Sequence, residues 1–257
     1  MKKIIFSVLV ISLAFWSCSE DNDLERKTVD VSLNFTQNWN DTIVTRSDFN
    51  DIKFTNKNGE KLSITKLRYL ISDVTFYNQN GDTIATKDYN LIDLEKDESL
   101  TFKLSEKIPT GTYSKVIFTF GFNKEDNIDG AYQDLNTTSF NVPEMMGGGY
   151  HFMQFEGKFI DSTNSVSNFN YHTISAINNS DPTNVIKTDT SFDVTLSNVT
   201  ISSNATIEVK SDLSQWFKNP NIWDLNVLNI DLMGNYDAQI KMSANGKSVF
   251  SLGEIIQ

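Results

Sequence analysis

The chain contains only two histidines, His151 and His172, and both lie in one part of the sequence. Three methionines lie close to them in the chain, namely Met145, Met146 and Met153. Imidazole nitrogen and thioether sulfur together suit copper, and Cu(I) in particular. These residues therefore form a candidate copper site, with the histidines as the imidazole ligands and the methionines as reserve thioether ligands.

The strands predicted around these residues decide whether the two imidazoles can meet. Residues 150–160 and 169–174 alternate apolar and polar side chains, which predicts two strands. If these strands pair as a hairpin, their outer ends come together and both imidazoles lie near one rim. The same alternation places His151 and Met153 on one strand face. A structural role stays open, with hydrogen-bonded histidines and with methionines that fill a core or a loop.

Other motifs that carry chemistry are incomplete. Residues 125–130 resemble the first half of a calcium loop, but the twelfth position is Asn136 instead of the bidentate glutamate of an EF-hand. The glycines at 147–149 lack the helix and the Lys-Ser/Thr pair of a phosphate loop. No Gly-x-Ser-x-Gly elbow is present, and no carboxylate pair has the sequence context of a glycosidase. The sequence nominates no catalytic residue, so we expect a binding protein and not an enzyme.

The N-terminus has the layout of a bacterial lipoprotein signal. Lys2 and Lys3 precede a short apolar run that ends at Cys18, which is the only cysteine of the chain. The run is too short for a membrane-spanning helix, which needs roughly twenty apolar residues. We therefore predict a cleaved signal peptide over 1–17, acyl chains on Cys18 that hold the protein on the membrane, and a flexible tether over 18–28. The alternative is an ordinary secretory signal with an incidental cysteine.

Cysteine usage and charge exclude several classes of function. A lipidated Cys18 leaves no thiol for a disulfide, a nucleophile or a thiolate metal site. Residues 1–17 contain two lysines and no acidic residue, so their removal changes the formal net charge from −11 to −13. Such a protein repels phosphate backbones, which makes nucleic acid an unsuitable partner.

Period-two alternation dominates the rest of the chain and predicts half-buried strands. Turn signals such as Asn58-Gly59 and Pro109-Thr110-Gly111 separate the runs, which cover residues 29–35, 52–54, 69–77, 100–104, 116–120, 150–160, 192–199 and 205–209. Helix signals occur only late, over 211–217 and about 231–245. The pattern predicts one all-β domain over 29–257, an antiparallel β-sandwich with one or two short helices near the C-terminus.

A second class of function stays open beside metal binding. A surface lipoprotein can bind a carbohydrate or a partner protein through exposed aromatic side chains on one sandwich face, and Trp39, Trp216 and Trp223 are candidates here. Two histidines close to a common point favour a metal site instead.

Several segments follow one another in a characteristic order over about residues 29–252. They are 67–74 (LRYLISDV), 89–93 (YNLID), 109–113 (PTGTY), 118–122 (FTFGF), 149–157 (GYHFMQFEG), 171–172 (YH) and 245–250 (NGKSVF). Taken together, these segments resemble the MbnP-like family, which is named for the methanobactin-associated periplasmic copper-binding protein.

This resemblance implies a secreted or lipid-anchored β-sandwich that binds copper outside the inner membrane. It also implies a di-haem peroxidase-like or an outer-membrane transport partner. The acidic stretch after Cys18, residues 19–23 (SEDND), resembles the tether of lipoproteins that are sent to the outer face of the outer membrane, so we expect an outer-membrane location that faces the periplasm or the cell surface. His172 matches the later histidine of the family, whereas His151 replaces a position that is not a ligand in relatives. Many relatives carry Met-x-Trp-x-Trp where this chain has residues 145–149 (MMGGG), and Gln37 stands where a histidine is expected.

Overall fold

The structure is a computed structural model that describes residues 27–181 and 183–257. The predicted signal peptide, Cys18 and all of the predicted tether except its last two residues lie outside the described residues. No described helix combines the length and the apolar character needed to cross a membrane.

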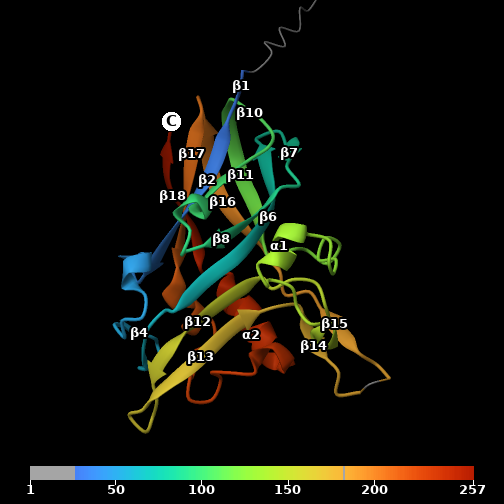
Figure 1. The fold of residues 1–257 in the computed structure, drawn as a ribbon. Coiled ribbons are helices and arrows are strands. Elements are labelled where there is room, and N and C mark those ends of the chain that lie inside the picture. The colour runs from blue at the N-terminus through green and yellow to red at the C-terminus, as the bar shows by residue number, and fades with distance from the viewer. Residues whose placement is uncertain (1–26, 182) are drawn as a thin grey trace, which may run out of the picture.

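Two sheets make up most of the fold (Figure 1). The larger sheet has nine strands, in the order β16 (Phe192–Ile201), β11 (Gly111–Phe120), β6 (Lys66–Asn78), β12 (Met153–Ile160), β5 (Lys61–Leu62) and β4 (Phe54–Thr55), with β13 (Val166–Thr173) on β12 and with β7 (Thr83–Ala85) and β8 (Tyr89–Asp93) on β6. The smaller sheet has five strands, in the order β18 (Phe250–Ile256), β17 (Ala205–Asp212), β2 (Val31–Trp39) and β3 (Thr42–Val44), with β9 (Thr101–Lys103) on β2.

Short elements connect and flank the sheets. Two small ladders pair β1 (Thr28–Val29) with β10 (Ile108–Pro109), and β14 (Ala176–Asn178) with β15 (Ile186–Thr188). The described helices are α1 (Gln133–Thr137), α2 (Tyr236–Gly246) and the 3₁₀ turns η1 (Arg46–Asp48), η2 (Asp97–Leu100), η3 (Glu144–Met146), η4 (Leu213–Phe217) and η5 (Leu232–Gly234).

The core lies between the two sheets. Every second residue of β2 from Val31 to Trp39 is buried, and the residues between them are partly exposed. The ring of Phe35 on β2 lies 6.0 Å from the ring of Tyr69 on β6 and 5.7 Å from the ring of Phe118 on β11. These contacts join the sheets face to face, and they confirm the predicted β-sandwich.

All strand pairs are antiparallel among the described residues except β2 with β17, which pair in parallel.

The late helix signals correspond to real elements with different boundaries. The signal over 231–245 becomes η5 followed by α2, which begins after the N-cap Asn235 and ends at Gly246. The prediction of a helix over 211–217 is wrong at its start, because β17 continues to Asp212 and only the 3₁₀ turn η4 follows. Ser211 is buried and pairs with Gln37 on one side and Phe250 on the other, so the sheet ladder holds it in the strand.

The predicted hairpin around the histidines is confirmed. β12 and β13 pair antiparallel over their full lengths, with Met153 opposite Thr173 and Gln154 opposite His172. Their core face carries buried aromatic rings such as those of Phe155 and Tyr171. His172 therefore lies with Gln154 on the face of the sheet that points away from the sandwich core.

Candidate functional site

The structure brings the two histidines together. Their ring centroids lie 5.2 Å apart, and the ring planes are almost perpendicular at 86°. His172 is on β13, whereas His151 lies just before β12, in a segment where its backbone N–H donates to the carbonyl of Phe140 at 2.9 Å. The Phe140 ring packs beside the His151 imidazole, with a centroid distance of 5.7 Å.

The hydrogen bonds of His151 define its tautomer. Nδ1 lies 2.9 Å from the carbonyl oxygen of Phe140, which can only accept, so Nδ1 carries the proton and Nε2 carries the lone pair. Burial lowers the pKa of His151 to about 4, because the side chain is only 5% exposed and a charged imidazole loses its hydration there. Nε2 is buried and has no hydrogen-bond partner among the described residues. The site thus contains a neutral imidazole nitrogen with an unshared lone pair.

His172 is held by a carboxylate. Its Nε2 lies 3.0 Å from Oε1 of Glu156, which also accepts a hydrogen bond from Nζ of Lys66 at 2.9 Å. The hydrogen bond from His172, together with Lys66, lowers the pKa of Glu156 from 4.5 to about 2. Because Nε2 donates to the carboxylate, Nδ1 of His172 has the lone pair in the neutral ring.

Glu156→Gln should lower the free energy of unfolding by about 1 kcal/mol at pH 7, because a neutral amide replaces a carboxylate that two donors share. The folded-state pKa lies below the unfolded one, so this stability is complete above pH 4.5 and disappears as the pH falls toward about 2. Urea denaturation at a series of pH values measures it. A difference between variant and wild type that stays constant with pH would contradict this account.

Of the three candidate methionines, only Met146 lines a groove that a histidine also lines. The partly buried Met146 and His172 line the same groove of about 380 Å³. Met145 is 80% exposed and is not among the groove residues. Met153 is fully buried within the hydrophobic core.

The predicted alternation around His151 is therefore wrong. Strand β12 begins only at Met153, and the chain bends at Phe152, whose N–H donates to the carbonyl of Thr173 at 2.7 Å. The bend breaks the period of two, so His151 lies with His172 while Met153 points into the core. Met153 is buried in the core and does not line the groove of His172.

Two residues near the groove of His172, Met233 and Gln239, are not among the candidates predicted from the sequence. Met233 lies on η5 and lines the groove together with His172 and Met146. Gln239 on α2 is 1% exposed and connects the backbone of β13 to that of η5 through its amide. Both are about sixty residues or more from His172 in the chain, so spacing alone carried no signal for either.

Two acidic side chains of residues 125–130, which resemble the first half of a calcium loop, make hydrogen bonds within the protein. Oδ1 of Asp129 accepts from the backbone N–H of Gly149 at 3.1 Å, and Oδ2 of Asp126 accepts from the Asn123 amide at 2.7 Å. No group of three or more His, Cys, Asp or Glu side chains is arranged to hold a metal ion in the part of the chain that the structure describes.

The candidate aromatic binding face is not formed by the tryptophans that were nominated for it. Trp39, Trp216 and Trp223 are all buried in the core, where for example Trp223 packs on Tyr171 with ring centroids 4.6 Å apart. The prediction that these side chains line an exposed sandwich face is wrong, because their large apolar surfaces fill the space between the sheets.

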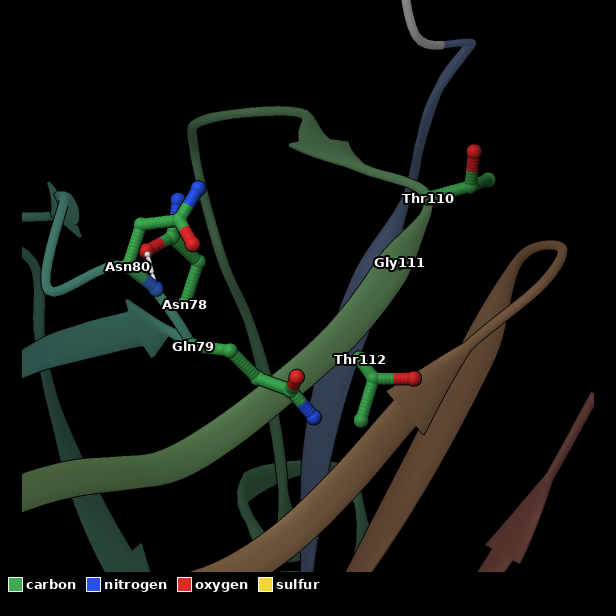
Figure 2. Close-up of a pocket in the computed structure, with 6 residues that line it drawn as sticks. All are labelled: Asn78, Gln79, Asn80, Thr110, Gly111 and Thr112. Carbon is green, nitrogen blue, oxygen red and sulfur yellow. Dashed lines mark hydrogen bonds between the residues drawn. The ribbon is translucent and has the colours of Figure 1, made fainter.

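A second hollow lies at the other end of β6 and is shown in Figure 2. It is lined by Asn78, Gln79, Asn80, Thr110, Gly111 and Thr112, without a charged or aromatic side chain. The side-chain oxygen of Asn78 already makes hydrogen bonds within its own turn, because Oδ1 accepts from the N–H groups of Asn80 and Asp82, both at 2.9 Å. This hollow is lined by amide and hydroxyl groups and has no histidine or methionine side chain.

Comparisons with known proteins agree on one family. The family model of MbnP matches residues 28–235. Among solved structures, MbnP from Methylosinus trichosporium is similar to this chain with a TM-score of 0.58 at 14% sequence identity, over 88% of this chain and 99% of that chain. At this identity the structural match reports the fold alone. Comparison with curated proteins gives no match.

Proposed function

This chain belongs to the MbnP family, and from that premise we propose that it binds copper through His151 and His172, with Met146 as a thioether ligand. The protein would capture or deliver the metal and would not catalyse a reaction. The observation that carries the proposal is the buried, unpartnered Nε2 of His151 beside the ring of His172.

The spacing of the two rings is compatible with one shared metal. Imidazoles bound at metal–nitrogen distances of about 2 Å and at a near-tetrahedral angle have centroids about 5 Å apart. The observed separation is 5.2 Å. An uncompensated buried lone pair costs free energy, so a metal at Nε2 of His151 would also satisfy a group that the apoprotein leaves unpaired.

The surrounding groups support metal binding by His172. A carboxylate that accepts from the second nitrogen of a ligating histidine fixes its tautomer and its orientation, which is the arrangement of Glu156 with His172. Two imidazoles and a thioether form a soft, neutral donor set, and such a set prefers copper to calcium or magnesium. Bound copper would supply a soft metal centre for capture and transfer.

We further propose that acyl chains on Cys18 anchor the protein to the outer membrane. In Figure 1 the first described strand, β1, lies at one end of the molecule, and β13, α2, β14 and β15 lie toward the other end. A protein tethered through its N-terminus would then present the histidine site away from the membrane. That orientation suits a partner such as a di-haem peroxidase-like protein or an outer-membrane transporter.

Metal content tests the proposed function directly. The full chain, purified in mild detergent with Cys18→Ser so that no thiol competes, is exposed to equimolar copper, zinc and calcium, desalted and measured by mass spectrometry. We expect about one copper per chain, since one pair of imidazoles lies beside one groove. Copper-free protein would refute the proposal and redirect the search to glycan or protein ligands.

His172→Ala should lower copper affinity at least tenfold, because it removes the imidazole that Glu156 orients. Competition with a chromophoric chelator measures the change. Asn168→Ala is the matched control, since Asn168 is exposed on the same face of β13 and should leave affinity unchanged. Equal affinity of His172→Ala and wild type would remove His172 from the site.

A further inference from the structure

We infer that Met233 supplies a second thioether to the metal at His151 and His172, which makes the site selective for Cu(I) over Cu(II) and Zn²⁺. This inference rests on the proposed copper function and names a ligand that neither the sequence pattern nor the hairpin indicates. Thioether sulfur is a soft donor that binds Cu(I) well and Zn²⁺ poorly, so each added methionine shifts selectivity toward the monovalent ion.

Two separate segments place methionine side chains along the groove that His172 lines. Met146 comes from η3 and Met233 from η5, and both line the groove with Asn170, His172 and Asp231. The two methionines are partly exposed, unlike Met153 and Met242, which are fully buried in the core. Met146 and Met233 therefore keep sulfur accessible to an ion that enters the groove.

A buried amide fixes η5 against the strand of His172. Nε2 of Gln239 donates to the carbonyl oxygens of His172 and Leu232, each at 2.9 Å, and Oε1 accepts from the N–H of Ile174 at 2.9 Å. One side chain that is 1% exposed thus joins the backbone on both sides of the groove. Gln239 is a positioning residue, which holds Met233 near His172 without contact with the metal.

Two further contacts restrain the same segment. Leu232 is buried in the core, so the residue directly before Met233 anchors the turn. The N–H of Asn170 donates to the carbonyl of Asn229 at 2.7 Å, which ties the chain before η5 to the edge of β13. The position of Met233 is therefore determined by packing and hydrogen bonds, as expected of a built ligand site.

The charge around the groove favours a cation. The carboxylate of Asp231 lines it, and the whole chain carries a formal net charge of −11. Such a field attracts cations and raises their local concentration. The neutral imidazoles and thioethers then select the soft ion among the cations that arrive.

Affinity for the two oxidation states of copper tests the inference. The full chain with Cys18→Ser, in detergent, is titrated with Cu(I) under ascorbate against bicinchoninate, and with Cu(II) in a parallel series. Met233→Leu keeps the volume and removes the sulfur. We expect at least a tenfold loss of Cu(I) affinity and a change of less than twofold for Cu(II). Met145→Leu, at the exposed methionine outside the groove, should change neither affinity.

Methyl signals of labelled methionine give a second readout that does not depend on affinity. One equivalent of Ag(I), a redox-inert substitute for Cu(I), should shift the methyl resonances of Met146 and Met233 and leave those of the core residues Met153 and Met242 in place. If wild type binds copper and Met233→Leu binds Cu(I) equally well, this inference fails while the proposed function stands. If wild type binds no copper, the proposed function fails and the inference fails with it.

Discussion

Replacing Gly157 with alanine should lower the free energy of unfolding by about 3 kcal/mol, the upper part of the usual overpacking range. A Cβ at this position would lie 2.0 Å from the carbonyl oxygen of Ser63 and 2.6 Å from the ring of Phe169. Backbone cannot move aside as a flexible side chain can, so either β5 separates from β12 or the Phe169 ring leaves the core. Urea denaturation followed by tryptophan fluorescence measures the change.

The same substitution should also weaken metal binding, since Gly157 pairs with Phe169 in the hairpin that carries His172. Gly234→Ala is the matched control. A Cβ there meets no atom within 4 Å, so its stability should stay within about 0.5 kcal/mol of wild type. Equal stability of the two variants would show that the close approach at Gly157 relaxes without cost.

Acidification should cost the metal-free protein about 3 kcal/mol between pH 6.5 and pH 4 through His151 alone. Burial holds the folded-state pKa of His151 at about 4, against an ordinary value of 6.5. Between these values the unfolded chain binds a proton that the folded protein does not, so stability is lost as the pH falls. His151→Phe keeps a ring in the cavity and cannot titrate.

The measurement is the difference between the two stability curves over this pH interval. The carboxylates titrate in the same way in wild type and in His151→Phe, so their contributions cancel in the difference. The contribution of Glu156 to stability changes at lower pH, between 4.5 and about 2. Curves that run parallel from pH 6.5 to pH 4 would mean that the His151 imidazole accepts a proton in the folded state with little penalty. That result would also weaken the case for a free, neutral Nε2.

The Asn245-Gly246 pair has a clear physical role in this fold. Asn245 is fully buried, and its amide donates to the carbonyls of Trp216 at 2.7 Å and Asn221 at 2.9 Å. A Cβ at Gly246 would lie 2.5 Å from the ring of Phe192 and 2.6 Å from that of Trp216. Only glycine fits under these rings, so the Asn-Gly pair marks a packing constraint at the end of α2 and not a ligand site.

Local patterns in the sequence were sufficient for the sandwich and for the β12–β13 hairpin that carries His172. Side chains on a strand alternate between its two faces, so the spacing of the apolar residues indicates which face is buried. A short connection brings neighbouring strands together. These features depend on residues close in the chain, where spacing and geometry are tightly linked.

The composition of the groove was decided by tertiary structure. A bend at Phe152 places His151 beside His172 and not on the core face with Met153, and the amide of Gln239 joins η5, which carries Met233, to the strand of His172 although 61 positions separate Met233 and His172 in the sequence. Burial of the tryptophans was equally invisible, because Trp216 and Trp223 lie outside the strands and are covered by segments that are distant in the sequence. The sequence by itself determined which donors exist and which strands carry them, whereas long-range packing decided which donors share one groove, since local periodicity contains no information about contacts between distant segments.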